Sequence, residues 1–123
     1  MCGRFYAQED DIEDMLLAAA RTTGARNVDN DAAAGIAVGE IFPGSTVLAV
    51  ANSKSLSPAV FAMKWGYPKR EGNGLIINAR SESAAEKPMF AQSAQTRRCL
   101  IPMTYYFEWE KRDSKKIKYA IGP

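Results

Sequence analysis

The sequence begins MCGRF, and its second residue is a cysteine. Removal of Met1, which is routine before a small second residue, would leave Cys2 with a free α-amine beside its thiol. An amine and a thiol on adjacent carbons condense with an aldehyde, first to an imine and then to a five-membered thiazolidine ring. In model peptides an α-amine has a pKa of about 8 and a thiol one of about 8.5, so such groups are partly in their reactive forms at neutral pH. The chemistry expected at Cys2 is therefore the covalent trapping of an aldehyde.

The composition excludes catalytic sites that depend on histidine. The 123 residues contain no histidine, which removes Ser–His and Cys–His nucleophile pairs and the most common metal ligand. The two cysteines, Cys2 and Cys99, form no CxxC pair, so neither a zinc site nor a disulfide is expected. We expect no metal and no organic cofactor. Cys99 precedes two apolar residues, and we expect it to be a small buried hydrophobic residue.

The charge of the chain is unevenly distributed. Residues 1–64 hold five Lys/Arg and eight Asp/Glu, a net charge of −3, whereas residues 65–123 hold eleven and six, a net charge of +5. A basic half indicates an anionic partner such as nucleic acid. Charge alone would favour the simpler interpretation, which is a solvated charged surface.

Length and composition are typical of one soluble globular domain. The chain is 46% apolar and 24% charged, and no apolar run approaches the ~18 residues of a membrane span. The N-terminus lacks a basic region followed by a hydrophobic stretch, so no signal peptide is expected. We therefore expect a cytoplasmic or nucleoid location and no membrane partner.

The first half of the chain should supply one helix and several short strands. Residues 2–6 read as a strand and residues 9–22 as a helix that ends at Gly24. Its apolar stripe follows helical spacing and comprises Ile12, Met15, Leu16 and Ala19. Residues 23–39 read as a loop, and strands are expected at 46–51 and 59–65.

The second half should be richer in strands. Residues 75–78 read as a short apolar strand, and residues 81–94 as short helices broken around Pro88. Three further strands are expected in CLIP, TYYFEWEK and KIKYAIG, with RDSKK as a hairpin turn between the last two. The predicted class is α+β, mostly β and barrel-like, with one early amphipathic helix.

Four stretches of the sequence hold unusual residues: MCGRF, MKWGYP, IINARSE and RRCLIPMTYYFEWE. Each has a simple structural explanation when taken alone. Trp65 would more often be a core residue than a ligand platform, Asn78 could end a strand, and Glu108 could lie on the exposed face of a strand.

Taken together and in this order, the four stretches resemble the SOS-response-associated peptidase (SRAP) family. Members of that family begin MCGRF or MCGRY and carry a WG element. They also carry an NAR element followed by Ser or Ala and then Glu, and an RCL element that leads into EW. The resemblance runs over nearly the whole chain, and it implies a single, partial SRAP domain over residues 1–123. It also implies the barrel-like fold of the family, with C-terminal strands missing.

The resemblance implies a protein that shields abasic sites in single-stranded DNA. The sugar of an abasic site can open, and it then presents an aldehyde. Cys2 would be the trapping nucleophile. Asn78 would hold the Cys2 amine and the sugar, and Glu108 would move protons during ring closure and reversal.

The family's DNA-binding residues carry over in the same way. Arg4 and Arg80 would bind phosphates that flank the lesion, because arginine makes paired contacts to phosphate. Trp65 and Gly66 would belong to a wedge that stacks against bases and blocks continuation of a duplex. The implied partner is therefore single-stranded DNA that contains an abasic site.

Family members usually continue past this length to an HDRMP-like motif, whose histidine is expected to help open the sugar ring. A chain that lacks these strands would leave strand edges unpaired, so we expect a homodimer that covers the exposed edges.

Two other functions remain open. The chain could be a cysteine peptidase, as the family name suggests, that cuts its own N-terminal residues. Without histidine, the base of such a peptidase would have to be the α-amine or Glu108. Alternatively, the chain could be an inactive remnant that binds DNA through its basic half. If the chain traps abasic sites, changing Cys2 to Ala would abolish crosslinking but leave weak, salt-sensitive DNA binding. If the chain is an inactive remnant, the same weak DNA binding would remain.

Overall fold

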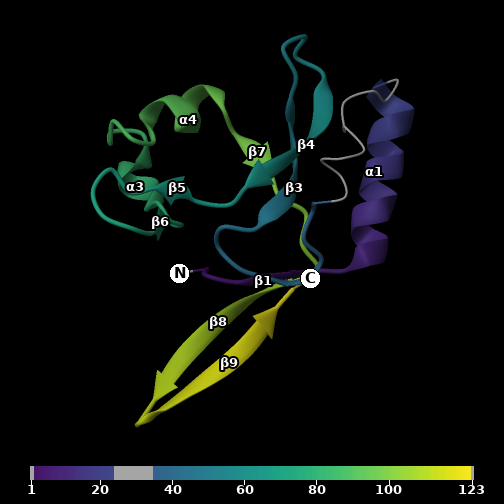
Figure 1. Cartoon of the computed structure of the whole chain (residues 1–123). Coiled ribbons are helices and arrows are strands. Elements are labelled where there is room, and N and C mark those ends of the chain that lie inside the picture. Colours follow the sequence, from purple (N-terminus) through teal and green to yellow (C-terminus); the bar gives the residue numbers. More distant parts are fainter. Residues whose placement is uncertain (1, 24–34, 123) are drawn as a thin grey trace.

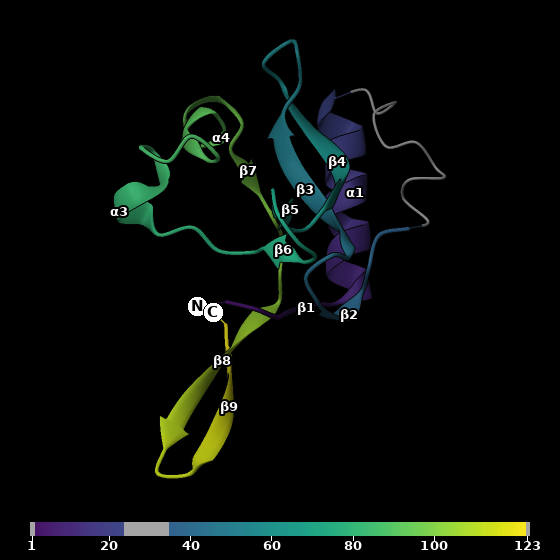
Figure 2. The same ribbon diagram turned by 60° about the vertical axis from the view of Figure 1, so that its left-hand side comes forward.

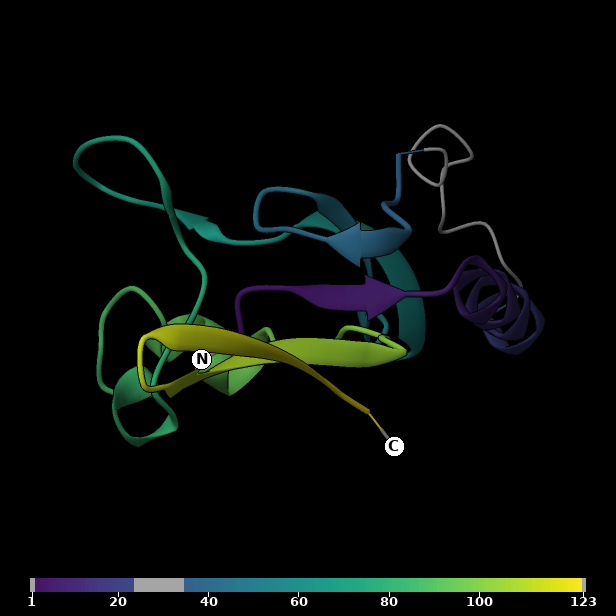
Figure 3. The same cartoon turned by 90° about the horizontal axis from the view of Figure 1, so that it is seen from below.

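The structure is a computed structural model that describes residues 2–23 and 35–122 (Figure 1). Its largest sheet has four antiparallel strands in the order β2-β1-β8-β9. Seen from below, the N-terminal strand β1 lies between β2 and the β8-β9 hairpin (Figure 3). The bounds of these strands are Phe5–Ala7 for β1, Gly39–Ile41 for β2, Tyr105–Arg112 for β8 and Lys115–Ile121 for β9.

A second sheet has the order β4-β3-β7, and a third consists of β5 and β6. In the second sheet β3 pairs with β4 along its whole length, from Thr46 opposite Lys64 to Asn52 opposite Pro58. The bounds are Thr46–Asn52 for β3, Pro58–Lys64 for β4, Cys99–Leu100 for β7, Tyr67–Pro68 for β5 and Leu75–Ile76 for β6.

Helix α1 (Glu9–Thr23) packs beside β4 on one side of the second sheet. The short helices α3 (Ser81–Ala84) and α4 (Ala91–Thr96) lie on the other side, together with β5 and β6 (Figures 1 and 2). The expected stripe of α1 is confirmed where it is described, because Ile12 is buried and Met15 and Leu16 pack against the core. The side chain of Ala19 and the expected helix stop at Gly24 lie outside the described residues.

The core lies where α1, β1, β2 and the β3-β4 hairpin meet. Its buried cluster comprises Phe5, Ala7, Ile12, Ile41, Val47, Leu48 and Val60. Burial of such side chains is the main favourable contribution to folding, at about 25 cal/mol per Å² of apolar surface. The strand that carries the N-terminal motif is therefore fixed to the core through two of its three residues.

One threonine fastens β8 to the start of α1. The backbone N–H of Gln8 donates to the Thr104 hydroxyl oxygen at 3.0 Å, and that hydroxyl donates to the carboxylate of Asp11 at 2.7 Å. The backbone N–H of Thr104 also donates to the carbonyl of Tyr6 at 2.8 Å. These contacts set the register of β8 against β1, and so the position of Glu108.

The predicted α+β, mostly β class is confirmed. The described strands form three separate sheets and do not close into a barrel, because β2 and β9 end the four-stranded sheet without a further partner in this part of the chain. The hairpin turn expected in RDSKK is confirmed and is tight, with Asp113 at φ 55°. The β8-β9 hairpin extends away from the rest of the molecule (Figures 1 and 2).

Strand β2 and the two-residue strand β5 were not predicted. Most of the loop expected over 23–39 lies outside the described residues, but its last residue begins β2. No helix in the described ranges is both long enough and apolar enough to span a membrane.

Candidate functional site

Cys2 and Asn78 are brought together although 76 residues separate them in sequence. The side-chain amide of Asn78 donates a hydrogen bond of 2.9 Å to the backbone carbonyl oxygen of Cys2. Cys2 is half-buried and its thiol is free, with Sγ 3.6 Å from the carbonyl oxygen of Arg4. The predicted nucleophile and its predicted holding residue are therefore neighbours.

Glu108 lies beside the same N-terminal segment. Strands β1 and β8 are antiparallel with Phe5 opposite Tyr106, and the N–H of Phe107 donates to the carbonyl of Arg4 at 2.9 Å. Because antiparallel pairing runs in opposite directions, the next residue of β8, Glu108, lies alongside residues 2–4. Its side chain is half-buried. The third predicted catalytic residue is thus on the strand next to Cys2.

Trp65 and Gly66 lie on the core side of β1. The Trp65 ring is 5.2 Å from the Phe5 ring between centroids, and it packs against the core. Gly66 has φ +108°, and a Cβ there would lie 3.2 Å from the side chain of Leu75. A Cβ on Gly3 would lie 3.9 Å from Ile77, so the segment that ends in Asn78 packs over this same side.

Arg4 points to the opposite face of the four-stranded sheet, because side chains alternate along a strand and Phe5 faces the core. Its guanidinium lies 4.4 Å from the centre of the Phe42 ring and 5.2 Å from that of Trp109. It also forms an ion pair of 3.0 Å with Glu40. The phosphate contact predicted for Arg4 would require it to leave or share this carboxylate.

Glu40 is shared by two cations. Lys118 Nζ lies 2.6 Å from the same carboxylate oxygen that Arg4 contacts, and it also lies 3.7 Å from the centre of the Phe107 ring. Hydrogen bonds from Lys118 and then from Arg4 hold the pKa of the Glu40 carboxyl below its usual 4.5, although burial opposes this. Glu40 is therefore ionised at neutral pH, and the two cations share its single negative charge.

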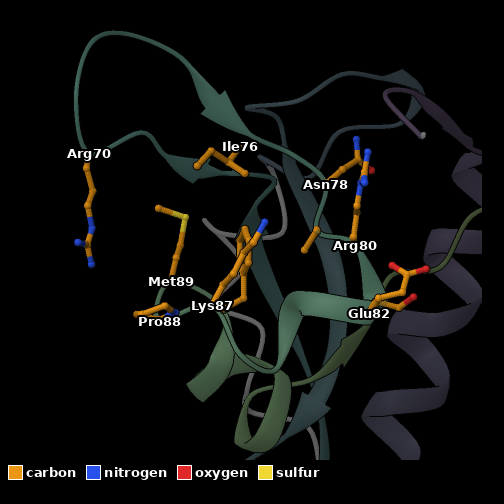
Figure 4. A pocket seen from close by; sticks show the side chains of 11 residues that line it. Arg70, Ile76, Asn78, Arg80, Glu82, Lys87, Pro88 and Met89 are labelled. Carbon is orange, nitrogen blue, oxygen red and sulfur yellow. The ribbon is translucent and has the colours of Figure 1, made fainter.

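Arg80 lies in a pocket that also contains Asn78 (Figure 4). The pocket has a volume of about 860 Å³ and is bounded by β6 and the segment that carries α3. Its polar side chains include Arg70, Lys87 and Glu82. The predicted DNA contact Arg80 and the predicted holding residue Asn78 therefore share one concave surface.

Several site residues were missed by sequence reasoning. Glu40 and Lys118 carry no local signal, because their link to Arg4 spans strands that are distant in sequence. Arg70 and Lys87 belong to the basic second half of the chain. The charge of that half indicated an anionic partner, but it could not show which cations would line a pocket. The prediction for Cys99 was wrong, because this residue is exposed. It lies in the two-residue strand β7 at the edge of its sheet.

The arrangement can support covalent chemistry at Cys2. A carboxylate on the neighbouring strand and an amide at hydrogen-bond distance flank the N-terminal segment. A carboxylate near a nucleophile can move protons within hydrogen-bond reach. Cations in the adjoining pocket can bind an anionic substrate.

Comparisons with known proteins agree with these motifs. A family model described as SOS response associated peptidase (SRAP) matches residues 1–123. The abasic site processing protein YoaM of Bacillus subtilis (strain 168) is 33% identical over 131 residues, which cover 98% of this chain and 53% of that protein. The abasic site processing protein YoqW of the same organism is 30% identical over 135 residues, which cover 98% of this chain and 54% of that protein. The chain thus spans about half the length of these curated relatives.

Proposed function

The chain belongs to the SOS response associated peptidase (SRAP) family, and on that premise we propose that it processes abasic sites in DNA by trapping them covalently at Cys2. The observation that carries this proposal is the hydrogen bond from the Asn78 side chain to the Cys2 carbonyl. It joins the two motifs that would hold the nucleophile and the sugar. The relatives named as abasic site processing proteins support the choice of substrate.

The proposed reaction begins when the Met1–Cys2 bond is cleaved and the Cys2 α-amine is free. The amine adds to the C1′ aldehyde of the ring-opened abasic sugar, and loss of water gives an imine. The thiol then adds across the carbon–nitrogen double bond, with sulfur bonding to C1′ and the thiol proton passing to nitrogen. The product is a thiazolidine that links the protein to DNA.

Asn78 and Glu108 have supporting roles in this proposal. Asn78 fixes the backbone of Cys2, so that the amine and thiol meet the aldehyde in one orientation. Glu108 takes and returns protons as water leaves and the ring closes, because it lies on the strand beside the N-terminal segment.

DNA binding is proposed to prefer a single strand. Arg80 and, after release from Glu40, Arg4 would bind phosphates without reading sequence, which suits recognition of damage. Trp65 and Gly66 would lie at the wedge that ends a duplex. The single-strand preference is tested by presenting the same lesion in a duplex, where we expect less product.

The proposal is tested by mixing the full chain with a single-stranded oligonucleotide that bears one abasic site. Intact-mass measurement then reads both the adduct and the state of the N-terminus. We expect a heat-stable adduct on protein that has lost Met1. The adduct should be absent in Cys2→Ala and retained in Cys99→Ala, which removes the other free thiol. If protein lacking Met1 gives no adduct, the proposal fails; if Met1 is retained, an aminopeptidase is used to remove it first.

A further inference from the structure

The pocket beside Asn78 has the size and lining of a ligand site. Its volume of about 860 Å³ falls within the range of about 300–1,000 Å³ that is typical of small-molecule sites. Part of its lining is apolar, and Phe90 is held by an edge-on contact of 5.7 Å with the Tyr67 ring. The apolar lining residues include Ile76, Pro88, Met89 and Phe90.

The same pocket is lined by more cations than carboxylates. Arg70, Arg80 and Lys87 line it and are exposed, and none of them takes part in an ion pair within the described part of the chain. One carboxylate, Glu82, lines the pocket with them. This differs from Arg4 on the other face, which forms an ion pair of 3.0 Å with Glu40. A pocket with excess positive charge attracts an anionic ligand.

Two of the cations, Arg70 and Arg80, lie on opposite sides of the apolar part (Figure 4). In the view of Figure 4, Arg70 lies on one side of the pocket and Asn78 and Arg80 on the other, with Met89 and Lys87 between them. A ligand that spans the pocket would meet positive charge at both ends, and between them an apolar surface beside the Lys87 side chain. A nucleotide within a strand has this pattern, since its base is flat and largely apolar on its faces and a phosphate lies on either side.

Resting on the proposed function, we propose that this pocket binds the intact nucleotide that neighbours the abasic residue. The base of this nucleotide would lie on Met89 and Pro88. Arg70 and Lys87 would bind its phosphate on the side away from the abasic sugar. Asn78 makes the connection, because the same side chain lines the pocket and bonds to Cys2. A strand whose abasic sugar is at Cys2 therefore has its next nucleotide beside the pocket. Arg70 and Lys87 are positioning residues in this proposal.

Recognition in this pocket would not depend strongly on base identity. Contacts of a base face with apolar side chains and of phosphates with cations are available to every nucleotide. The neighbouring nucleotide must be unpaired for its base to enter. The pocket therefore gives a physical reason for a single-strand preference that does not involve Trp65 or Gly66.

The proposal is tested by equilibrium binding of the full chain to a short, fluorescent single strand with a central tetrahydrofuran, an abasic analogue that has no aldehyde. The Arg70→Ala/Lys87→Ala variant should bind about tenfold more weakly, and the slope of its log–log salt dependence should fall by about 0.7 for each phosphate that the variant no longer binds. The matched control is Lys115→Ala/Lys116→Ala, which removes two exposed cations at the hairpin turn and should bind within about twofold of the unchanged protein.

The base contact is tested by changing the DNA, which avoids any effect on folding. Replacing the nucleotide on one side of the lesion by a second tetrahydrofuran should weaken binding by about fivefold or more. The same change on the other side should have less effect, and the difference identifies which neighbour occupies the pocket. The proposal would be overturned if the two double variants weakened binding equally, or if neither flanking replacement had an effect. It would also be overturned if the unchanged protein showed no measurable binding.

These outcomes are separable from those of the proposed function. The tetrahydrofuran strand cannot form a thiazolidine, so the binding experiment reports on the pocket alone. An adduct at Cys2 with no effect of the Arg70→Ala/Lys87→Ala variant on binding would leave the proposed function standing and reject the pocket. Pocket-dependent binding without an adduct would reject covalent trapping and retain a nucleotide site.

Discussion

The Asn78 side chain donates a hydrogen bond of 2.9 Å to the backbone carbonyl oxygen of Cys2, across 76 residues of sequence. This contact is directed at the backbone, not at the thiol. It therefore fixes where the N-terminal residue lies without altering the group that reacts. It also couples the N-terminal segment to the pocket lined by Arg80, because Asn78 belongs to both.

Asn78→Ala should slow adduct formation with an abasic single strand. Loss of one exposed hydrogen bond typically costs about 0.5–1.5 kcal/mol, which corresponds to a rate about twofold to tenfold lower if the bond orients Cys2 for reaction. The measurement is the initial rate of adduct formation by protein that lacks Met1. Asn73→Ala, in the exposed loop between β5 and β6, is the control and should react at the unchanged rate. Equal rates for Asn78→Ala and the control would contradict the orienting role.

Helical and strand periodicity predicted most elements of this fold. The apolar spacing in residues 9–22 identified α1, because this helix turns one face to the core. The alternation in 59–65 identified β4, although its buried residues, Ala59 and Val60, are consecutive and do not alternate. Strand β2 is only three residues long and owes its existence to pairing with β1, from Phe5 opposite Ile41 to Ala7 opposite Gly39. Such a strand has too few residues to show a period, so it could not be predicted from sequence.

The candidate site was only partly accessible to sequence reasoning. The motifs that contain Cys2, Asn78 and Glu108 could be recognised by their residues, but their proximity depends on the β1-β8 register and on one side-chain hydrogen bond. The surroundings of Arg4 could not be inferred at all. Its partner Glu40 lies on a strand that sequence reasoning missed, and the second cation, Lys118, lies on β9.

Gly66→Ala should destabilise the fold because of its backbone conformation. At φ +108° an L-residue is strained, and the added Cβ would lie 3.2 Å from the Leu75 side chain. We expect the free energy of unfolding to fall by about 1–3 kcal/mol, measured by denaturant or thermal unfolding. Gly72→Ala is the matched control, since Gly72 also has a positive φ, +73°, but nothing lies within 4 Å of the Cβ position. An equal loss in both variants would show that the contact with Leu75 does not matter.

Trp65→Ala should also lower the free energy of unfolding. The ring lies 5.2 Å from that of Phe5 and packs against the core, but it is only half-buried. The free energy of unfolding should fall by about 2–3 kcal/mol. This is less than the loss of about 3–5 kcal/mol that is usual for a fully buried aromatic residue. Trp109→Ala, a tryptophan that is 38% exposed on the opposite face, should cost less in the same unfolding assay. If the two variants were equally stable, Trp65 would not support the core.

Glu40→Gln should change the acid dependence of stability. The pKa of Glu40 is lowered from 4.5 by hydrogen bonds from Lys118 and Arg4, so the ionised form is favoured in the folded chain. The contribution of the ionised Glu40 carboxylate to the free energy of unfolding is present above pH 4.5. It is lost as the pH falls through the lowered pKa of Glu40 in the folded chain. The variant should therefore unfold at a lower temperature than the unchanged protein at pH 7, and the difference should shrink below pH 4.5. Because the pair is partly exposed, the effect should also decrease in high salt.

The same substitution should strengthen binding to single-stranded DNA. The Glu40 carboxylate occupies Arg4 at 3.0 Å and Lys118 at 2.6 Å, where it competes with any phosphate that approaches either cation. Removing its negative charge should lower the dissociation constant several-fold for the tetrahydrofuran strand at low salt. Glu13→Gln, which removes a negative charge from an exposed position on α1 outside the pocket, is the control for the change in net charge. A gain equal to that of the control would mean that Arg4 and Lys118 are structural cations. A larger gain would identify the reverse face of β1 as a second place where phosphate can bind.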